Sequence, residues 1–99
     1  MVAIELLRPL LREHLANPFP ESVEKGRDYG SVDPVMIDAD IYGWVMRAAE
    51  AGSLRVEDRN GLRDARTDLT DSLLALPLDA RPYFERLVAM ATLALDDHP

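Results

Sequence analysis

The chain has 99 residues, of which 47% are hydrophobic and 29% are charged, and this composition predicts one small folded domain over residues 1–99. It contains no cysteine, which excludes disulfides, zinc–thiolate sites, iron–sulfur clusters and thiol nucleophiles. The net charge of −7 argues against nucleic acid as a partner, because an acidic surface repels phosphate.

The first segment, from about Val2 to Ala16, has the periodicity of an amphipathic helix. Pro9 conflicts with this pattern, because a proline inside a helix removes a backbone hydrogen bond. We expect the helix to continue with a bend at Pro9, since the apolar stripe keeps its phase across that residue. The stripe consists of Ile4, Leu7, Leu10, Leu11 and Leu15.

Residues 17–33 predict a long loop. Pro18 and Pro20 end the first helix, because the residue before a proline is pushed out of the helical region. A loop of this length is unusual in so small a domain. We expect it to pack on the helices through its apolar side chains, which are Phe19, Val23, Tyr29 and Val32.

The second helix has the clearest boundaries. Asp33 is a favourable N-cap, Pro34 suits the first helical position, and Gly52 suits the position just after the last turn. These signals predict a helix over about Pro34 to Ala51. Its buried stripe is expected to be Ile37, Ile41, Trp44, Val45 and Ala48.

A third helix is predicted from about Glu57 to Ala75. The dipeptide Asn60-Gly61 also suits a β-hairpin, but the segment after it has poor strand composition, so helix is favoured. The expected stripe is Leu62, Ala65, Leu69, Leu73 and Leu76.

The fourth helix is expected from about Ala80 to Asp96, after Pro77 and with Asp79 as its cap. Residues 96–99 are expected to form a frayed tail. The apolar face of this helix comprises Phe84, Leu87, Val88, Ala91, Ala94 and Leu95, widened by Tyr83 and Met90. The predicted fold is therefore an all-α domain of about four helices, an orthogonal or partly antiparallel bundle with a long packed loop between the first two helices.

Asp38 is the most informative polar residue, because it lies inside the apolar stripe of the second helix. A carboxylate directed at a core needs a partner or becomes neutral. One interpretation is a binding pocket formed by Asp38 with Tyr42, Trp44 and the preceding loop at Tyr29. The more conservative interpretation, which we weigh more heavily, is that Asp38 favours the helix dipole and pairs with an arginine from another segment.

Other chemistry is poorly supported. His14 lies on the apolar face of the first helix, where a lone histidine is usually structural, and the remaining histidine, His98, is in the tail. No catalytic, cofactor-binding or phosphate-binding motif is found. Residues 56–67 resemble a calcium loop but lack its two most important carboxylates. The sequence therefore predicts no catalytic residue, no metal and no cofactor, and a protein that is not an enzyme.

Two further patterns concern partners. The third helix carries an acidic row on one flank and a basic row on the other, both of which are typical of solvated surfaces. The acidic row is Asp64, Asp68 and Asp71, and the basic row, with Arg55 before it, is Arg59, Arg63 and Arg66. Four apolar residues fall off the predicted inner faces and favour a homodimer if they converge: Leu6, Met36, Leu74 and Leu93.

The start of the chain lacks the features of a signal peptide, and no apolar run is long enough to span a membrane, so we expect a cytoplasmic protein without a membrane partner. Ten arginines against one lysine suggest a bacterial, GC-rich source. The most favoured function is a non-enzymatic protein-interaction domain that self-associates or binds another protein, as an immunity protein or antitoxin does. Alternatives are a small-molecule-binding protein or enzyme that uses residues 29–33 and 34–51, and a helix-turn-helix-like regulator.

Overall fold

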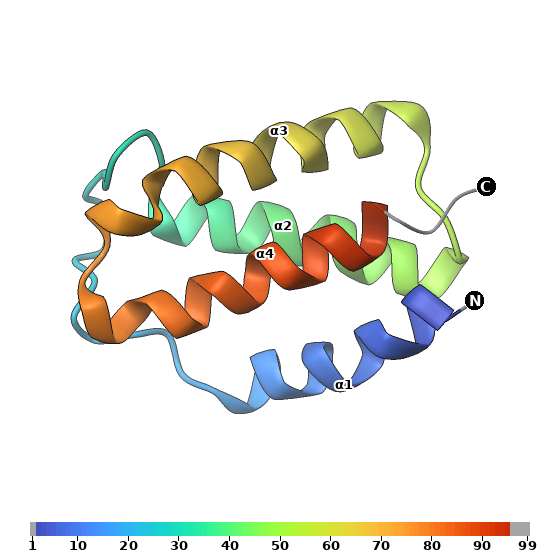
Figure 1. Cartoon of the computed structure of the whole chain (residues 1–99), viewed down its shortest axis with the longest axis horizontal. Coiled ribbons are helices and arrows are strands. Elements are labelled where there is room, and N and C mark those ends of the chain that lie inside the picture. Colours follow the sequence, from blue (N-terminus) through green and yellow to red (C-terminus); the bar gives the residue numbers. More distant parts are fainter. Residues whose placement is uncertain (1, 96–99) are drawn as a thin grey trace.

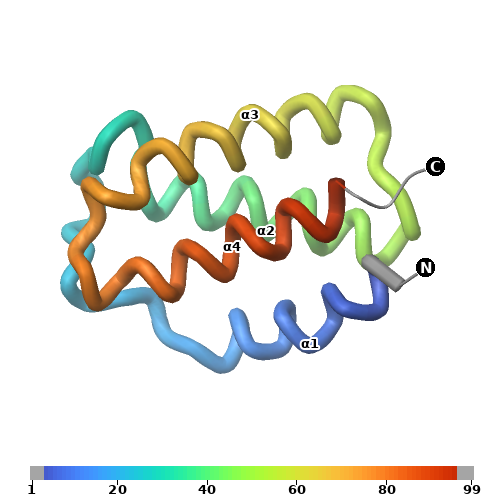
Figure 2. Tube along the Cα trace, viewed as in Figure 1, coloured from blue at the N-terminus to red at the C-terminus, as the bar shows by residue number. Residues whose placement is uncertain are grey.

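In the computed structural model, which describes residues 2–95, each of the four helices runs opposite to the one before it (Figures 1 and 2). The helices are α1 (Val2–Ala16), α2 (Pro34–Ala51), α3 (Val56–Ser72) and α4 (Arg81–Leu95). No strand occurs among these residues, apart from a single bridge between Tyr29 and Val32. The predicted all-α domain of four helices is therefore confirmed.

Helix α4 forms the centre of the bundle, because it contacts each of the other three helices. Its inner face is completely buried at Phe84, Leu87, Met90 and Ala91. The Cα radius of gyration is 12.9 Å, close to the value of about 13 Å for a 100-residue domain. The single core thus lies around α4.

The boundaries of α2 follow the predicted caps. Asp33 Oδ1 accepts hydrogen bonds from the backbone N–H groups of Val35 (3.0 Å) and Met36 (3.3 Å). Gly52 has a φ of 82° and donates its N–H to the Ala48 carbonyl over 2.8 Å. These contacts satisfy backbone groups that a helix end leaves open, and they fix where α2 enters the core.

The connection between α3 and α4 differs from the prediction. The helix α3 ends at Ser72, and the next residues form two 3₁₀ turns, Leu73–Ala75 and Leu78–Ala80. Asp79 lies inside the second turn and not directly before α4, so its predicted role as the cap of α4 is wrong. The reason is that Pro77 holds extended backbone between the two turns and α4 starts only at Arg81. The expected tail, 96–99, lies outside the described residues.

Helix α1 is continuous through Pro9, which is exposed. Its predicted core stripe is correct at Ile4, Leu7 and Leu11 and wrong at Leu15, whose exposed fraction is 70%. The buried face centres on Leu7, Leu11 and His14, and Leu15 lies at its edge in the last turn. His14 is buried on this face, as the sequence predicted.

The long loop packs on the bundle as predicted, with Val23, Tyr29 and Val32 buried. Tyr29 and Val32 exchange backbone hydrogen bonds of 2.8 and 3.2 Å. Gly30, with a φ of 61°, passes so close to α3 that an added Cβ would lie 2.6 Å from Ser72 Oγ. Ser31 N–H donates to the same hydroxyl over 3.1 Å. The loop is thus fixed to the end of α3.

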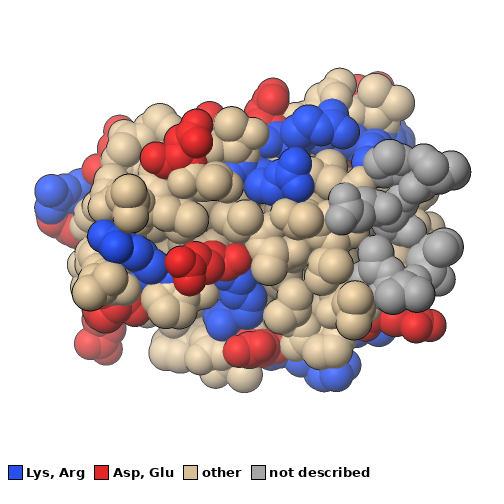
Figure 3. Space-filling model, viewed as in Figure 1, with Lys and Arg blue, Asp and Glu red and all other residues tan. Residues whose placement is uncertain are grey.

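Arginines of α3 contribute to packing as well as to the surface. Arg59 donates to the Leu95 carbonyl, and Arg66 donates to Thr92 Oγ1 over 3.2 Å, so both tie α3 to α4. Arg47 of α2 pairs with the mostly buried Asp58 over 3.0 Å. On the face shown in Figure 3, acidic and basic side chains are interspersed.

Of the apolar residues expected off the inner faces, Leu6, Met36 and Leu74 are exposed. Leu93 is partly buried and packs against the core, so its predicted exposure is wrong. Leu93 is next to the buried Ala94 on α4. Because α4 contacts all three other helices, few of its side chains remain exposed. No helix within residues 2–95 combines the length and apolarity needed to cross a bilayer.

Candidate functional site

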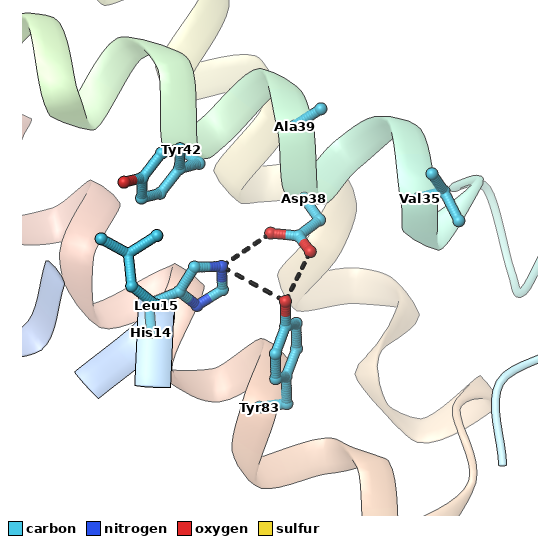
Figure 4. A pocket seen from close by; sticks show the side chains of 7 residues that line it. All are labelled: His14, Leu15, Val35, Asp38, Ala39, Tyr42 and Tyr83. Carbon is cyan, nitrogen blue, oxygen red and sulfur yellow. Dashed lines mark hydrogen bonds and ion pairs between the residues drawn. The ribbon is translucent and has the colours of Figure 1, made fainter. Parts of the chain in front are cut away.

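Three polar side chains from three helices meet beside the core (Figure 4). His14 Nε2 lies 2.9 Å from Asp38 Oδ1, and the Tyr83 hydroxyl lies 2.6 Å from Asp38 Oδ2. The same hydroxyl is 3.3 Å from His14 Nε2. The residues His14, Asp38 and Tyr83, called here the polar triad, thus connect α1, α2 and α4.

The hydrogen-bond pattern fixes where the protons lie. An ionised carboxylate only accepts hydrogen bonds, so Nε2 of His14 carries a proton and the Tyr83 hydroxyl donates to Asp38. The Nε2–H group points toward Asp38 Oδ1 and also toward the Tyr83 oxygen. The other ring nitrogen, Nδ1, is buried without a hydrogen-bond partner among the described residues.

Two aromatic rings pack against the His14 imidazole. The imidazole of His14 stacks on the Tyr42 ring with centroids 5.5 Å apart, and it lies at a tilt to the Tyr83 ring at 4.8 Å. Burial, and next the hydrogen bond to Asp38, raise the pKa of the Tyr83 phenol far above its usual value. The phenol consequently stays protonated throughout the physiological range and keeps its hydrogen bond to Asp38.

A pocket of about 390 Å³ opens beside the triad, between the end of α1 and the first half of α2. The side chain of Asp38 is 16% exposed and that of His14 only 7%, so Asp38 is the more accessible of the two. Apolar side chains form the rest of the wall. The residues that line the pocket are His14, Leu15, Val35, Asp38, Ala39, Tyr42 and Tyr83.

The structure brings together two of the four candidate binding residues. Asp38 and Tyr42, one helical turn apart, both line the pocket. Tyr29 is buried in the long loop, where its hydroxyl accepts from the Glu24 N–H over 2.9 Å. Trp44 packs on α3, where a Cβ added to Gly61 would lie 2.7 Å from its ring. Neither Tyr29 nor Trp44 lines the pocket.

The partner of Asp38 is not the arginine that the conservative interpretation proposed; it is a histidine and a tyrosine. Sequence reasoning placed His14 and Asp38 separately on apolar faces and treated Tyr83 as part of the core. The signal available was two complementary polar residues on two buried stripes. That signal could not show that His14 and Asp38 are in contact, because the alignment of α1 against α2 depends on the packing of the whole bundle.

A second hollow, of about 300 Å³, shares Tyr83 with the first and contains Arg86. The Arg86 guanidinium lies over the Tyr83 ring, 5.4 Å from its centroid, and its Nη1 is 3.6 Å from Glu13 Oε2. Its Nε and Nη2 are buried with no hydrogen-bond partner in the described part of the chain. Arg86 thus supports the outer side of the polar triad through Tyr83.

No group of three or more His, Asp or Glu residues within residues 2–95 is arranged to hold a metal ion. Comparison with protein-family models, with curated proteins and with solved structures finds no match to this chain.

Proposed function

We propose that this protein binds a small molecule in the pocket beside the polar triad. The observation that carries the proposal is the partly exposed Asp38 carboxylate, held by His14 and Tyr83 at one side of an otherwise apolar cavity. The volume of about 390 Å³ lies within the range of about 300–1,000 Å³ that is typical of ligand sites. A few convergent polar groups in an apolar wall are also typical of such sites.

Energetics support the same proposal. Removing charged groups from water costs several kcal/mol per ion, and well-packed apolar residues often give an equal or greater stability. A buried histidine–aspartate–tyrosine cluster is therefore expected to stabilise the fold no better than apolar residues would. Its position at a cavity, with one carboxylate accessible, favours a role in recognition.

The geometry favours binding over catalysis. A histidine that acts as a general base must present a free ring nitrogen to the substrate. In this site Nε2 is engaged by Asp38 and Tyr83, and Nδ1 is buried. Both nitrogens are therefore either engaged or buried, and we propose a binding protein and not an enzyme.

The test is a fragment screen on ¹⁵N-labelled protein by NMR. We expect hits to shift the amide signals of Leu15, Asp38, Ala39 and Tyr42. Ala39→Phe, which places a ring at the pocket wall, should abolish these shifts. Ala89→Phe, at an exposed alanine of α4 that does not line the pocket, should retain them. Fragments that bind both variants equally, or that shift no pocket residue, would contradict the proposal.

A second candidate function is self-association, supported by the exposure of two leucines in the link between α3 and α4. Leu74 and Leu78 are 81% and 75% exposed, and apolar groups presented this way favour a twofold contact with a second copy. Sedimentation equilibrium should give about twice the 11.1 kDa mass. The double variant Leu74→Ser/Leu78→Ser should give the monomer mass. A monomer in the unmodified protein at high micromolar concentration would contradict this candidate.

A further inference from the structure

The negative charge that Asp38 brings to the pocket indicates which class of small molecule it binds. Asp38 is its carboxylate, and each of the two oxygens carries one hydrogen bond, from His14 and from Tyr83. A carboxylate has about four acceptor positions, so both oxygens retain capacity for further donors. No Lys or Arg is among the residues that line this pocket.

The aromatic side chains of the pocket wall favour a positively charged ligand. The faces of aromatic rings carry negative potential and attract cations. Tyr42 and Tyr83 both line the pocket beside Asp38. The remaining wall, formed by Leu15, Val35 and Ala39, offers apolar contacts to an uncharged body.

We propose that the ligand is a small organic cation, with a protonated amine directed at Asp38 and an apolar group lying against Leu15 and Val35. This inference rests on the proposed function, since it assigns the chemistry of the same pocket. The net charge of −7 supports it through long-range attraction of cations. A neutral or anionic ligand would bring no positive charge to the partly exposed carboxylate of Asp38.

The experiment compares three probes of similar shape, benzylamine, benzyl alcohol and benzoate, by NMR titration of the full chain. At about pH 8 we expect benzylamine to bind at the pocket at least tenfold more tightly than the other two.

The variant Asp38→Asn removes the charge and should reduce benzylamine binding to the level of benzyl alcohol. Asp40→Asn removes an exposed acid of the same helix that does not line the pocket, and it should leave the difference intact. If Asp38→Asn does not fold, the order of the three probes on the unmodified protein still decides. Equal binding of all three, or preference for benzoate, would overturn the cation assignment but keep the pocket as a binding site. If none of the three probes shifts the amide signals of the pocket residues, the proposed function itself is overturned.

Discussion

The Tyr83 hydroxyl donates to Asp38 Oδ2 over 2.6 Å although the two residues are 45 positions apart in the sequence. This bond joins the central helix α4 to α2 and fixes the orientation of the carboxylate at the pocket. Hydrogen bonds to a charged group are stronger than those between neutral groups. The geometry of the site thus depends on one phenol.

Tyr83→Phe keeps the aromatic ring and removes this bond. We expect the free energy of unfolding to fall by about 1–2 kcal/mol, near the lower end for a bond to a charged group because Tyr83 is partly exposed. Urea denaturation measures the change. Tyr42→Phe is the matched control: its hydroxyl has no hydrogen bond among the described residues, and it should change stability by less than about 0.5 kcal/mol. Equal effects of the two substitutions would contradict the assigned bond.

The same phenol predicts a dependence of stability on alkaline pH. Burial and the bond to Asp38 raise the pKa of Tyr83 in the folded protein above the value of about 10 for an unfolded chain. The stabilisation that such a group contributes is fully present below its pKa in the unfolded chain. It is lost as the pH rises from that value toward the pKa in the folded protein. The stability advantage over Tyr83→Phe should therefore be constant up to about pH 9 and decline above about pH 10. Parallel stability profiles for the two proteins up to pH 11 would refute this assignment.

Asp33→Ala tests the N-cap of α2. The substitution removes the acceptor of the Val35 and Met36 N–H groups, and loss of such a cap costs about 0.5–2 kcal/mol. Thermal unfolding should show a lower midpoint. Asp33→Asn retains an acceptor oxygen and should recover most of the loss. An unchanged midpoint for the alanine variant would show that the cap contributes nothing.

Two glycines inside helices should respond to alanine in opposite directions. At Gly43 of α2 an added Cβ meets nothing within 4 Å, so the better helix propensity of alanine should stabilise the protein by about 0.5–1 kcal/mol. At Gly61 of α3 the Cβ would lie 2.7 and 2.9 Å from the Trp44 ring. The rigid indole must move, and overpacking of this kind costs about 1–3 kcal/mol. Urea denaturation of both variants would show the difference in sign, and stabilisation by both would disprove the close contact.

Much of the fold followed from local signals. The Asp33-Pro34 start and the Gly52 end of α2 are set by cap chemistry within a few residues, so the sequence alone predicted them. The helical interpretation of Asn60-Gly61 was correct because the apolar stripe of α3 outweighs the turn preference of that dipeptide. Asp79 failed as a cap because the turn after Pro77 depends on how the chain enters α4.

The candidate site was predictable only in part. Asp38 and Tyr42 share one helix face, so their association follows from spacing. His14 and Tyr83 join them through the packing of α1 and α4 against α2, which no local pattern encodes. The exposure of Leu15 has the same origin, since the position of the pocket between α1 and α2 decides which edge of the α1 stripe remains uncovered.

The way α1 is attached has a consequence for detection of the ligand. This helix packs mainly against α4 and less against α2, and the long loop separates it from α2 along the chain. Local opening of α1 would break the contact between His14 and Asp38 and dismantle the pocket. A bound molecule must leave before that opening, so occupancy should slow amide hydrogen exchange in α1 more than in α3. Protection of α1 in the exchange experiment would thereby report that the pocket is occupied.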